Sequence, residues 1–151
     1  MRRISLAALA ALLAIALTGC ATSPYGNYLQ SATVDQQNKL AGEAVKQLAT
    51  LWPPAKTRFE LKQATPDVFG VALVKGLRDS GYAIGEFNPK QTGSALTSDV
   101  HILPLRYALD QSKSGTSNLY HLTLLVGAES ITRPYLEKNG TMVPGYWTHK
   151  E

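Results

Sequence analysis

The chain has 151 residues, a formal net charge of +4 and a hydrophobic content of 44%. This length suits a single domain with a substantial hydrophobic core, and the one cysteine excludes both a disulfide framework within the chain and a cysteine-based metal site. The basic residues are spread along the sequence and form no run, so the composition gives no electrostatic footprint for nucleic acid.

The first residues have the three-part layout of a secretory signal. A short basic start, Met1–Arg3, precedes the apolar, alanine- and leucine-rich stretch Ile4–Leu17, and small residues follow. An apolar run of about fourteen residues is shorter than the roughly 20 that a transmembrane helix needs. We therefore predict that residues 1–19 are a signal peptide removed on export. The net charge then falls by two, because Arg2 and Arg3 leave with it.

The end of this segment, Leu17–Cys20, has the sequence Leu-Thr-Gly-Cys and resembles the bacterial lipobox. The resemblance implies that small Gly19 lets a peptidase approach the bond before Cys20, and that the Cys20 thiol takes up diacylglycerol. More than one acyl chain is what stable membrane anchoring requires. We predict signal cleavage between Gly19 and Cys20 and lipidation of Cys20. The alternative is an ordinary signal peptide followed by a chance cysteine.

Residues 20–33 are small and polar and include Pro24 and Gly26. We predict that they form a lipidated tether, which in full extension would lift the following domain by roughly 45 Å. Tyr25 and Tyr28 could lie at the level of the lipid headgroups or contact a partner. The alternative is that they belong to a disordered segment without either role.

Residues 34–151 are predicted to form one periplasmic α+β domain. Apolar residues recur at three- and four-residue steps in residues 35–51, which predicts a helix with Thr33 or Asp35 as its cap. This helix ends before Pro53, because a proline disfavours helical geometry at the residue that precedes it.

A β-α-β unit is predicted over residues 57–87. Apolar and charged residues alternate in 57–63, which is typical of a half-buried strand. Thr65–Asp67 then provides a cap, a proline at the first position and an acidic residue for a second helix. Gly81 can end this helix in the left-handed conformation, and residues 82–87 predict a second strand.

The second half of the chain predicts antiparallel strands. Residues 101–109 form a strand that Pro104 interrupts, which favours an edge position or a bulge and offers a place for strand addition by a partner. Residues 119–126 and 129–136 predict two further strands. Asn139–Gly140 is a strong signal for a tight hairpin.

This order of elements predicts an α+β fold with an N-terminal helix, a β-α-β unit and an antiparallel β-meander. The strands form a mixed sheet, and the helices lie on one face of it. The predicted core consists of Phe59, Leu61, Phe69, Leu73, Leu77, Ile84, Leu122, Leu124 and Val126.

No motif for catalysis or metal binding is present in the sequence. None of His101, His121 and His149 has a spacing that places two ligands on one helical face. His101 and His121 could approach each other across the sheet, but two histidines without a third ligand make a poor metal site. Glu60 and Glu86 could be sheet neighbours on a solvated face. We predict no enzymatic activity, no metal and no cofactor.

The aromatic C-terminal end is a candidate partner surface. Tyr135, Tyr146 and Trp147 lie in this region, and tyrosine and tryptophan are enriched at protein interfaces. The alternative is that these rings close the rim of the core.

Several segments together resemble one protein family. The lipobox Leu17–Cys20, the middle segment Phe69–Tyr82 and the tail segments Leu105–Tyr107, Thr132–Tyr135 and Pro144–Thr148 resemble the TrbH conjugal transfer lipoproteins. The resemblance implies a non-catalytic structural component of a conjugative type IV secretion (mating-pair formation) apparatus that transfers plasmid DNA. The protein would be an outer-membrane lipoprotein that faces the periplasm, and other conjugation-channel subunits would be its partners. The low net charge predicts no direct contact with nucleic acid.

Two features bear on this role. Ala21 follows the cysteine, where an aspartate commonly marks inner-membrane retention in enteric bacteria, and this favours the outer membrane. The small lipoprotein of the best-known type IV core complexes is little more than a lipid and a short peptide, whereas this chain adds a whole domain. The alternatives are a pilotin-like adaptor of another envelope secretion machine, or a small periplasmic ligand-binding lipoprotein with a pocket around His101 or His121.

Overall fold

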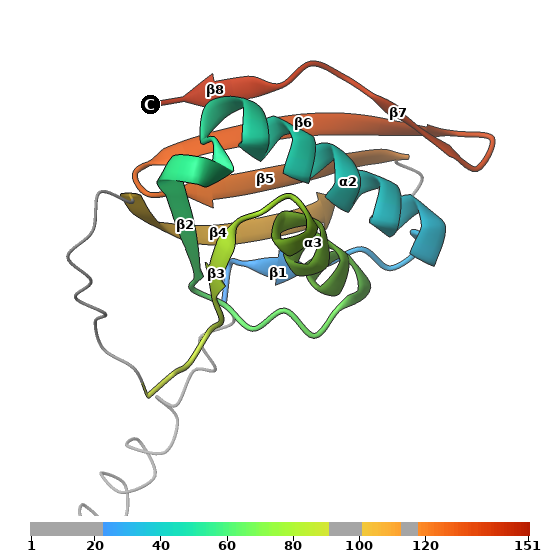
Figure 1. The fold of residues 1–151 in the computed structure, drawn as a ribbon. Coiled ribbons are helices and arrows are strands. Elements are labelled where there is room, and N and C mark those ends of the chain that lie inside the picture. The colour runs from blue at the N-terminus through green and yellow to red at the C-terminus, as the bar shows by residue number, and fades with distance from the viewer. Residues whose placement is uncertain (1–22, 91–100, 113–117) are drawn as a thin grey trace, which may run out of the picture.

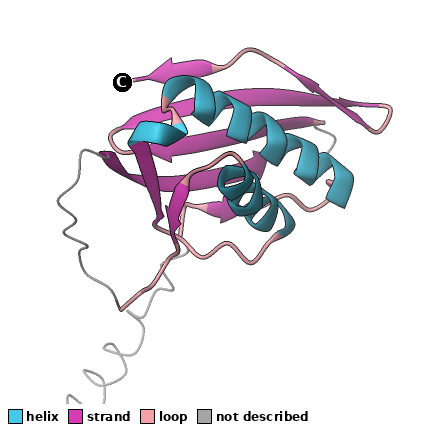
Figure 2. Ribbon diagram, viewed as in Figure 1, coloured by secondary structure: helices cyan, strands magenta, loops and turns pink. Residues whose placement is uncertain are grey.

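Two helices cover one face of a mixed eight-stranded sheet (Figures 1 and 2). The structure is a computed structural model, and it describes residues 23–90, 101–112 and 118–151. The predicted signal peptide and the lipobox with Gly19 and Cys20 lie outside the described residues. Within these residues, no helix is long and apolar enough to cross a membrane. The predicted α+β class, with a mixed sheet and helices on one face, is confirmed.

The main path of the sheet has the strand order β3-β2-β4-β5-β6-β7, while β1 pairs with β4 and β8 pairs with β6. Strands β1, β2 and β3 join the sheet in parallel, and the pairings from β4 onward to β8 are antiparallel. The elements are β1 (Gly26–Asn27), α2 (Val34–Leu51), a 3-10 turn (Pro54–Lys56), β2 (Thr57–Leu61), α3 (Val68–Asp79), β3 (Ala83–Gly85), β4 (His101–Gln111), β5 (Leu119–Val126), β6 (Glu129–Lys138), β7 (Thr141–Pro144) and β8 (Thr148–Lys150).

One edge of β4 is shared by two short strands. The first half of β4 pairs with β2, with Leu61 opposite Leu105 as the last pair, and β1 pairs further along with Ala108 and Leu109. Between these two pairings, the side-chain Oε1 of Gln63 accepts a hydrogen bond from the backbone N–H of Tyr107 at 3.0 Å. Gln63 therefore satisfies a buried donor at the point where neither strand reaches it.

The predicted edge position for Pro104 is wrong, because β4 lies between β2 and β5. The strand tolerates the proline for a geometric reason. The carbonyl of Leu105 accepts from Lys62 on the β2 side, whereas the carbonyl of Pro104 points the other way and accepts from Gly127 at 2.9 Å. The missing N–H of Pro104 thus faces the turn after Val126, where the β5 ladder has ended. Strand addition at this position is excluded by the neighbours of β4.

Helix α2 begins with a capping box. The Thr33 hydroxyl accepts from the backbone N–H of Gln36 at 3.2 Å, and the Gln36 side chain accepts from the backbone N–H of Thr33 at 2.7 Å. Of the two caps that the sequence allowed, Thr33 is the one used. The helix ends at Leu51, before Trp52 and Pro53, as predicted.

The cap of α3 is Asp67 and not Thr65, so the helix starts later than the sequence suggested. One oxygen of Asp67 accepts from the backbone N–H of Gly70 at 3.1 Å and from the side-chain amide of Asn27 at 3.0 Å. The other oxygen accepts from the hydroxyl of Tyr107 at 2.5 Å. A single carboxylate therefore joins β1, α3 and β4.

The segment predicted to be a tether is partly built into the domain. Strand β1 pairs with β4, and the backbone N–H of Tyr28 donates to the carbonyl of Leu109 at 2.8 Å. Further along, Leu29 packs against the core, and the hydroxyl of Ser31 lies 2.9 Å from that of Tyr120. The prediction of a free tether is therefore wrong for the described part of this segment, residues 23–33.

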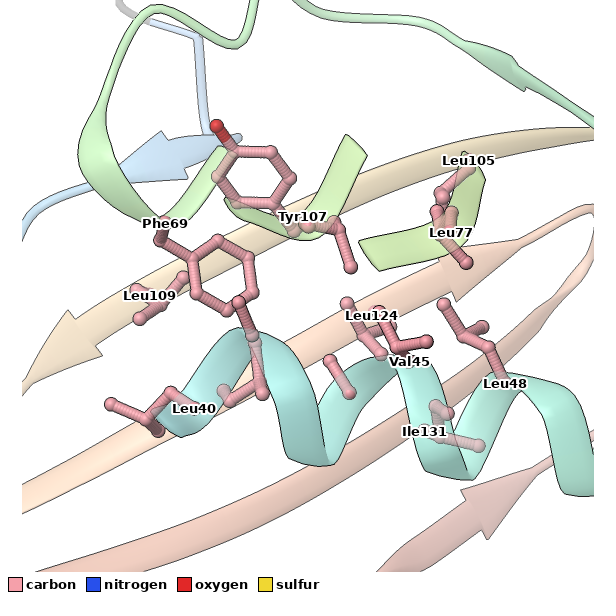
Figure 3. Close-up of a cluster of buried hydrophobic side chains, with 14 of the residues drawn as sticks. Leu40, Val45, Leu48, Phe69, Leu77, Leu105, Tyr107, Leu109, Leu124 and Ile131 are labelled. Atoms are coloured by element: carbon pink, nitrogen blue, oxygen red, sulfur yellow. The ribbon is translucent and has the colours of Figure 1, made fainter. Parts of the chain in front are cut away.

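The core lies between the sheet and the two helices (Figure 3). Every predicted core residue is buried except Ile84, which is half-buried and packs against the others. The ring of Tyr107 packs against Phe69 with centroids 5.0 Å apart, and Figure 3 shows its hydroxyl pointing out of the apolar cluster. At Gly70 and Gly76 the packing is so close that an added Cβ would clash with Tyr107 or Val45.

The predicted Asn139–Gly140 hairpin is confirmed. Lys138 pairs with Thr141 across the turn, and both turn residues have positive φ, +52° for Asn139 and +77° for Gly140. These are the angles of a type I′ turn, which asparagine followed by glycine adopts at little cost.

We expect Asp67→Ala to lower the free energy of unfolding by about 3 kcal/mol, because it removes a helix cap and leaves the Tyr107 hydroxyl without its acceptor. Urea denaturation followed by circular dichroism measures this loss. Asp35→Ala is the matched control, because Asp35 is an exposed acidic residue in the first turn of α2. Its loss should be about 0.5 kcal/mol, and equal losses in the two variants would contradict the role of Asp67.

Candidate partner-binding surface

The C-terminal tail crosses the outer edge of β6 between β7 and β8. Strand β7 pairs with the second half of β6 and β8 with the first half, so the residues between them pass Arg133 and Pro134. The backbone N–H of Gly145 donates to the carbonyl of Pro134 at 2.8 Å. The Arg133 Nε donates to the carbonyl of Gly145 at 2.7 Å. The tail is thereby fixed on both sides of Gly145.

Gly145 is needed for this close approach. A Cβ at this position would lie 2.8 Å from Cγ of Pro134 and 3.3 Å from its carbonyl oxygen. A proline ring cannot move aside, so a larger residue would push the tail off β6.

Arg133 joins the tail to helix α2. Its Nη1 donates to Oε2 of Glu43 at 3.0 Å, and both side chains are about one-fifth exposed, at 20% and 19%. Its guanidinium also lies over two rings, 5.5 Å from the centroid of Tyr135 and 5.3 Å from that of Trp147. A partly buried ion pair with stacked rings holds more firmly than an exposed pair.

Tyr135 is 1% exposed and therefore does not belong to the candidate surface. Its hydroxyl donates to Oε2 of Glu43 at 2.9 Å. Burial, followed by the negative charge of Glu43, raises the pKa of the Tyr135 phenol well above its ordinary value. For this ring the alternative interpretation, closure of the core, is the correct one.

Tyr146 and Trp147 have different environments. Trp147 is half-buried and packs against the core, whereas Tyr146 is 93% exposed. Nearby in sequence, Leu136 and Val143 face each other across β6 and β7 and are 45% and 46% exposed. Of the predicted partner surface, Tyr146 is thus the ring that a partner can reach, and Trp147 and Arg133 form its support.

A groove lies between the two helices. This groove has a volume of about 600 Å³. It is lined by Asn38, Gly42, Pro66, Val68, Val71, Ala72, Lys75, Gly76 and Asp79. A smaller groove runs along α3 toward Glu86. Neither groove is lined by His101 or His121, the residues around which the sequence placed a possible ligand pocket.

The expectation that His101 and His121 approach each other is wrong. His101 lies opposite Thr57 at the start of β4, whereas His121 lies opposite Asp110 near its end. Nine positions of an extended strand separate them, or roughly 30 Å. His121 lies 3.2 Å from the Asp110 carboxylate. Among the described residues, no group of three or more histidine, cysteine, aspartate or glutamate side chains could hold a metal ion.

Glu60 and Glu86 do not form a carboxylate pair on the sheet. Glu60 lies opposite Gly85 and forms an ion pair with Lys62 at 2.9 Å. Glu86 follows the end of β3 and pairs with Arg78 at 2.5 Å. Each acid is therefore balanced by its own base.

The family model of the conjugal transfer protein TrbH matches residues 22–151, which include every described residue. The chain belongs to the TrbH family. Its TrbH match contains the middle segment and all the tail segments on which the resemblance was based, and it identifies the protein as a conjugal transfer component. No curated protein and no solved structure matched the chain.

Sequence reasoning missed the partners that fix the C-terminal tail. Arg133 belongs to a segment that the sequence singled out, but nothing in the sequence connects it with Glu43, ninety residues earlier. Pro134 contacts Gly145 at this edge of the sheet. The two residues meet because of the register between β6 and β7, which the Asn139–Gly140 turn sets.

We expect Arg133→Ala to lower the free energy of unfolding by about 2 kcal/mol. It leaves the Glu43 carboxylate partly buried without its cation, and the loss stays below that of a fully buried pair because water reaches both groups. Tyr146→Ala, at an exposed position, should change stability by less than about 0.5 kcal/mol. Urea denaturation of both variants gives the comparison, and an unchanged stability of Arg133→Ala would show that the tail is held in another way.

The free energy of unfolding should also decrease above pH 10. The Tyr135 phenol of the unfolded chain ionises near pH 10 while the folded protein keeps it protonated, so stability falls by about 1.4 kcal/mol per pH unit for this group. Tyr135→Phe removes this contribution and should give a shallower decline between pH 10 and 11. Urea titrations at pH 9, 10 and 11 test it, and identical slopes would refute the assignment.

Proposed function

We propose that this TrbH family protein is an outer-membrane lipoprotein that serves as a non-catalytic structural subunit of a conjugative type IV secretion apparatus. The observation that carries this proposal is the match of the TrbH family model over residues 22–151. The subunit faces the periplasm and binds other conjugation-channel subunits, without contacting the plasmid DNA directly.

The membrane attachment in this proposal is the lipid on Cys20. Three sequence features support it: the signal-like residues 1–19, the lipobox Leu17–Cys20 and the absence of any other cysteine. Ala21 at the following position supports sorting to the outer membrane. Strand β1 begins at Gly26, six residues after Cys20, so the sheet begins close to the proposed lipid.

A non-catalytic role agrees with how the acidic side chains are used. Asp67 caps a helix and binds two further donors, and Glu43 fixes Arg133. Further carboxylates on the surface pair with Lys62, Lys75 and Arg78. Asp79 and Glu86 both line the smaller groove along α3, but each is paired there with a basic side chain. The carboxylates named here are thus engaged in structural contacts, whereas acid–base catalysis needs a carboxyl group within reach of a substrate proton.

Tyr146 is the proposed contact for another channel subunit. A tyrosine provides a large contact area and a hydroxyl for hydrogen bonding, and such residues often dominate binding energy. Because Arg133, Pro134 and Trp147 hold the backbone beside it, binding costs little additional ordering of the tail.

We expect Tyr146→Ala to lower plasmid transfer at least about tenfold, the effect of losing roughly 1.4 kcal/mol of binding, with normal protein level and stability. Mating assays measure transfer, and pull-downs from detergent-solubilised envelopes measure recovery of channel subunits. Val71→Ala is the matched control, because Val71 is 57% exposed in the groove between the helices. Loss of transfer in Val71→Ala with normal transfer in Tyr146→Ala would move the contact to the groove.

We expect Cys20→Ser to release the protein from the membrane fraction, because the residue that carries the acyl chains is lost. Labelling with radioactive palmitate should mark the wild type and not the variant, and sucrose-gradient separation of the two membranes tests the outer-membrane location. An unlabelled wild-type protein would refute the lipid anchor, while the family assignment would be unaffected.

A further inference from the structure

The chain enters the domain at one edge of the sheet, where aromatic side chains lie next to β1 and β3. Strand β1 lies along β4 at the edge that also ends in β3 (Figure 1). We call Tyr25, Tyr28, Phe87 and Arg106, which lie on or next to β1, β3 and β4, the N-terminal edge patch. Tyr25 is half-buried. Tyr28 is 44% exposed, and Phe87, which follows β3, is 42% exposed. The guanidinium of Arg106 lies 5.1 Å from the ring centroid of Tyr25.

The two tyrosines of this patch are held in place by the fold. The backbone N–H of Tyr28 donates to the carbonyl of Leu109, and its hydroxyl contacts the backbone carbonyls of Ser23 and Tyr25. The neighbouring side chain, Asn27, is fixed to Asp67 at 3.0 Å and to Gln37 at 2.7 Å. The chain before β1 is thus fastened to the domain from Ser23 onward.

This fastening limits the distance between the patch and Cys20. Five peptide steps separate Cys20 from Tyr25, and a fully extended chain of that length reaches about 17 Å. The polar headgroup layer on each side of a bilayer is itself roughly 6 Å thick. A lipid on Cys20 therefore keeps Tyr25 within about 11 Å of the headgroup layer, in contrast to the roughly 45 Å that a free tether would allow.

The chemistry of the patch suits the headgroup layer. Tyrosine rings are enriched at membrane–water interfaces because their bodies are apolar and their hydroxyls are polar. Phe87 adds apolar area, and the Arg106 guanidinium is suited to phosphate oxygens. The short link also gives the patch an effective concentration near the surface in the millimolar range, so that even a weak contact is populated.

We propose that the N-terminal edge patch rests on the phospholipid headgroups of the membrane that holds Cys20. This placement rests on the proposed lipid anchor. It also orients the domain, because β7 and β8, the strands on either side of Tyr146, lie at the opposite edge of the sheet. Four strand spacings separate the two edges, or about 19 Å, so Tyr146 is held away from the lipid and toward other subunits.

The single cysteine permits a test that does not depend on lipidation in cells. The chain from Cys20 onward, which contains every described residue, is coupled through its thiol to maleimide-headgroup lipid. The vesicles contain phosphatidylethanolamine and phosphatidylglycerol, with a phosphatidylcholine that has a nitroxide quencher on its headgroup. Tryptophan fluorescence of Tyr28→Trp and Tyr146→Trp reports how close each edge of the sheet lies to the quencher. The wild-type protein gives the fluorescence of Trp52 and Trp147, which is subtracted.

We expect the added tryptophan to be quenched at least about twofold more strongly at position 28 than at position 146, because only position 28 would lie at the headgroup level. Phe87→Trp is a second reporter that keeps the hydrogen bonds of Tyr28 intact and should be quenched like Tyr28→Trp. Equal quenching at both edges, stronger quenching at position 146 or no quenching at either would overturn the placement. Palmitate labelling of Cys20 in cells separately decides the anchor, so the two failures are distinguishable.

Discussion

The carboxylate of Asp67 holds together three elements that are distant in sequence. It caps α3, accepts from the side chain of Asn27 on β1 and accepts from the hydroxyl of Tyr107 on β4. Burial and the neighbouring Asp67 charge raise the pKa of the Tyr107 phenol, so this donor keeps its proton at all physiological pH values. A satisfied polar cluster of this kind fixes one arrangement of its elements, because each alternative leaves a buried group without a partner.

Local patterns in the sequence predicted most of the elements. The three- and four-residue periodicity predicted α2, the alternation in 57–63 predicted β2, and the Asn139–Gly140 pair predicted the hairpin. These local patterns could not predict which strands lie next to one another in the sheet. Pro104 suggested an edge, but it lies in a central strand, because whether a proline is tolerated depends on where the adjacent ladder ends. The polar residues before α2 suggested a tether, but the ladder with β4 incorporates them.

The candidate partner surface was also predicted only in part from the sequence. Composition singled out the aromatic tail, and the exposure of Tyr146 agrees with that choice. Tyr135 is similar in sequence context but is buried, since alternate residues of a strand face opposite sides and β6 turns this one toward α2. The support of the tail by Glu43 and Arg133 is a long-range ion pair that no local pattern reports.

The junction of β1 with β4 has a mechanical consequence. A pulling force on the chain before Ser23 reaches the domain at β1, which lies parallel to β4. When the force acts along β1, it loads the backbone hydrogen bonds between the two strands together and not one after another. Strand β1 has only two residues, and the hydrogen bonds of the Asn27 side chain to Asp67 and Gln37 share this load. Force on the N-terminus therefore reaches the capped end of α3 and the middle of the sheet directly, which couples the tensile strength of the attachment to the integrity of the core.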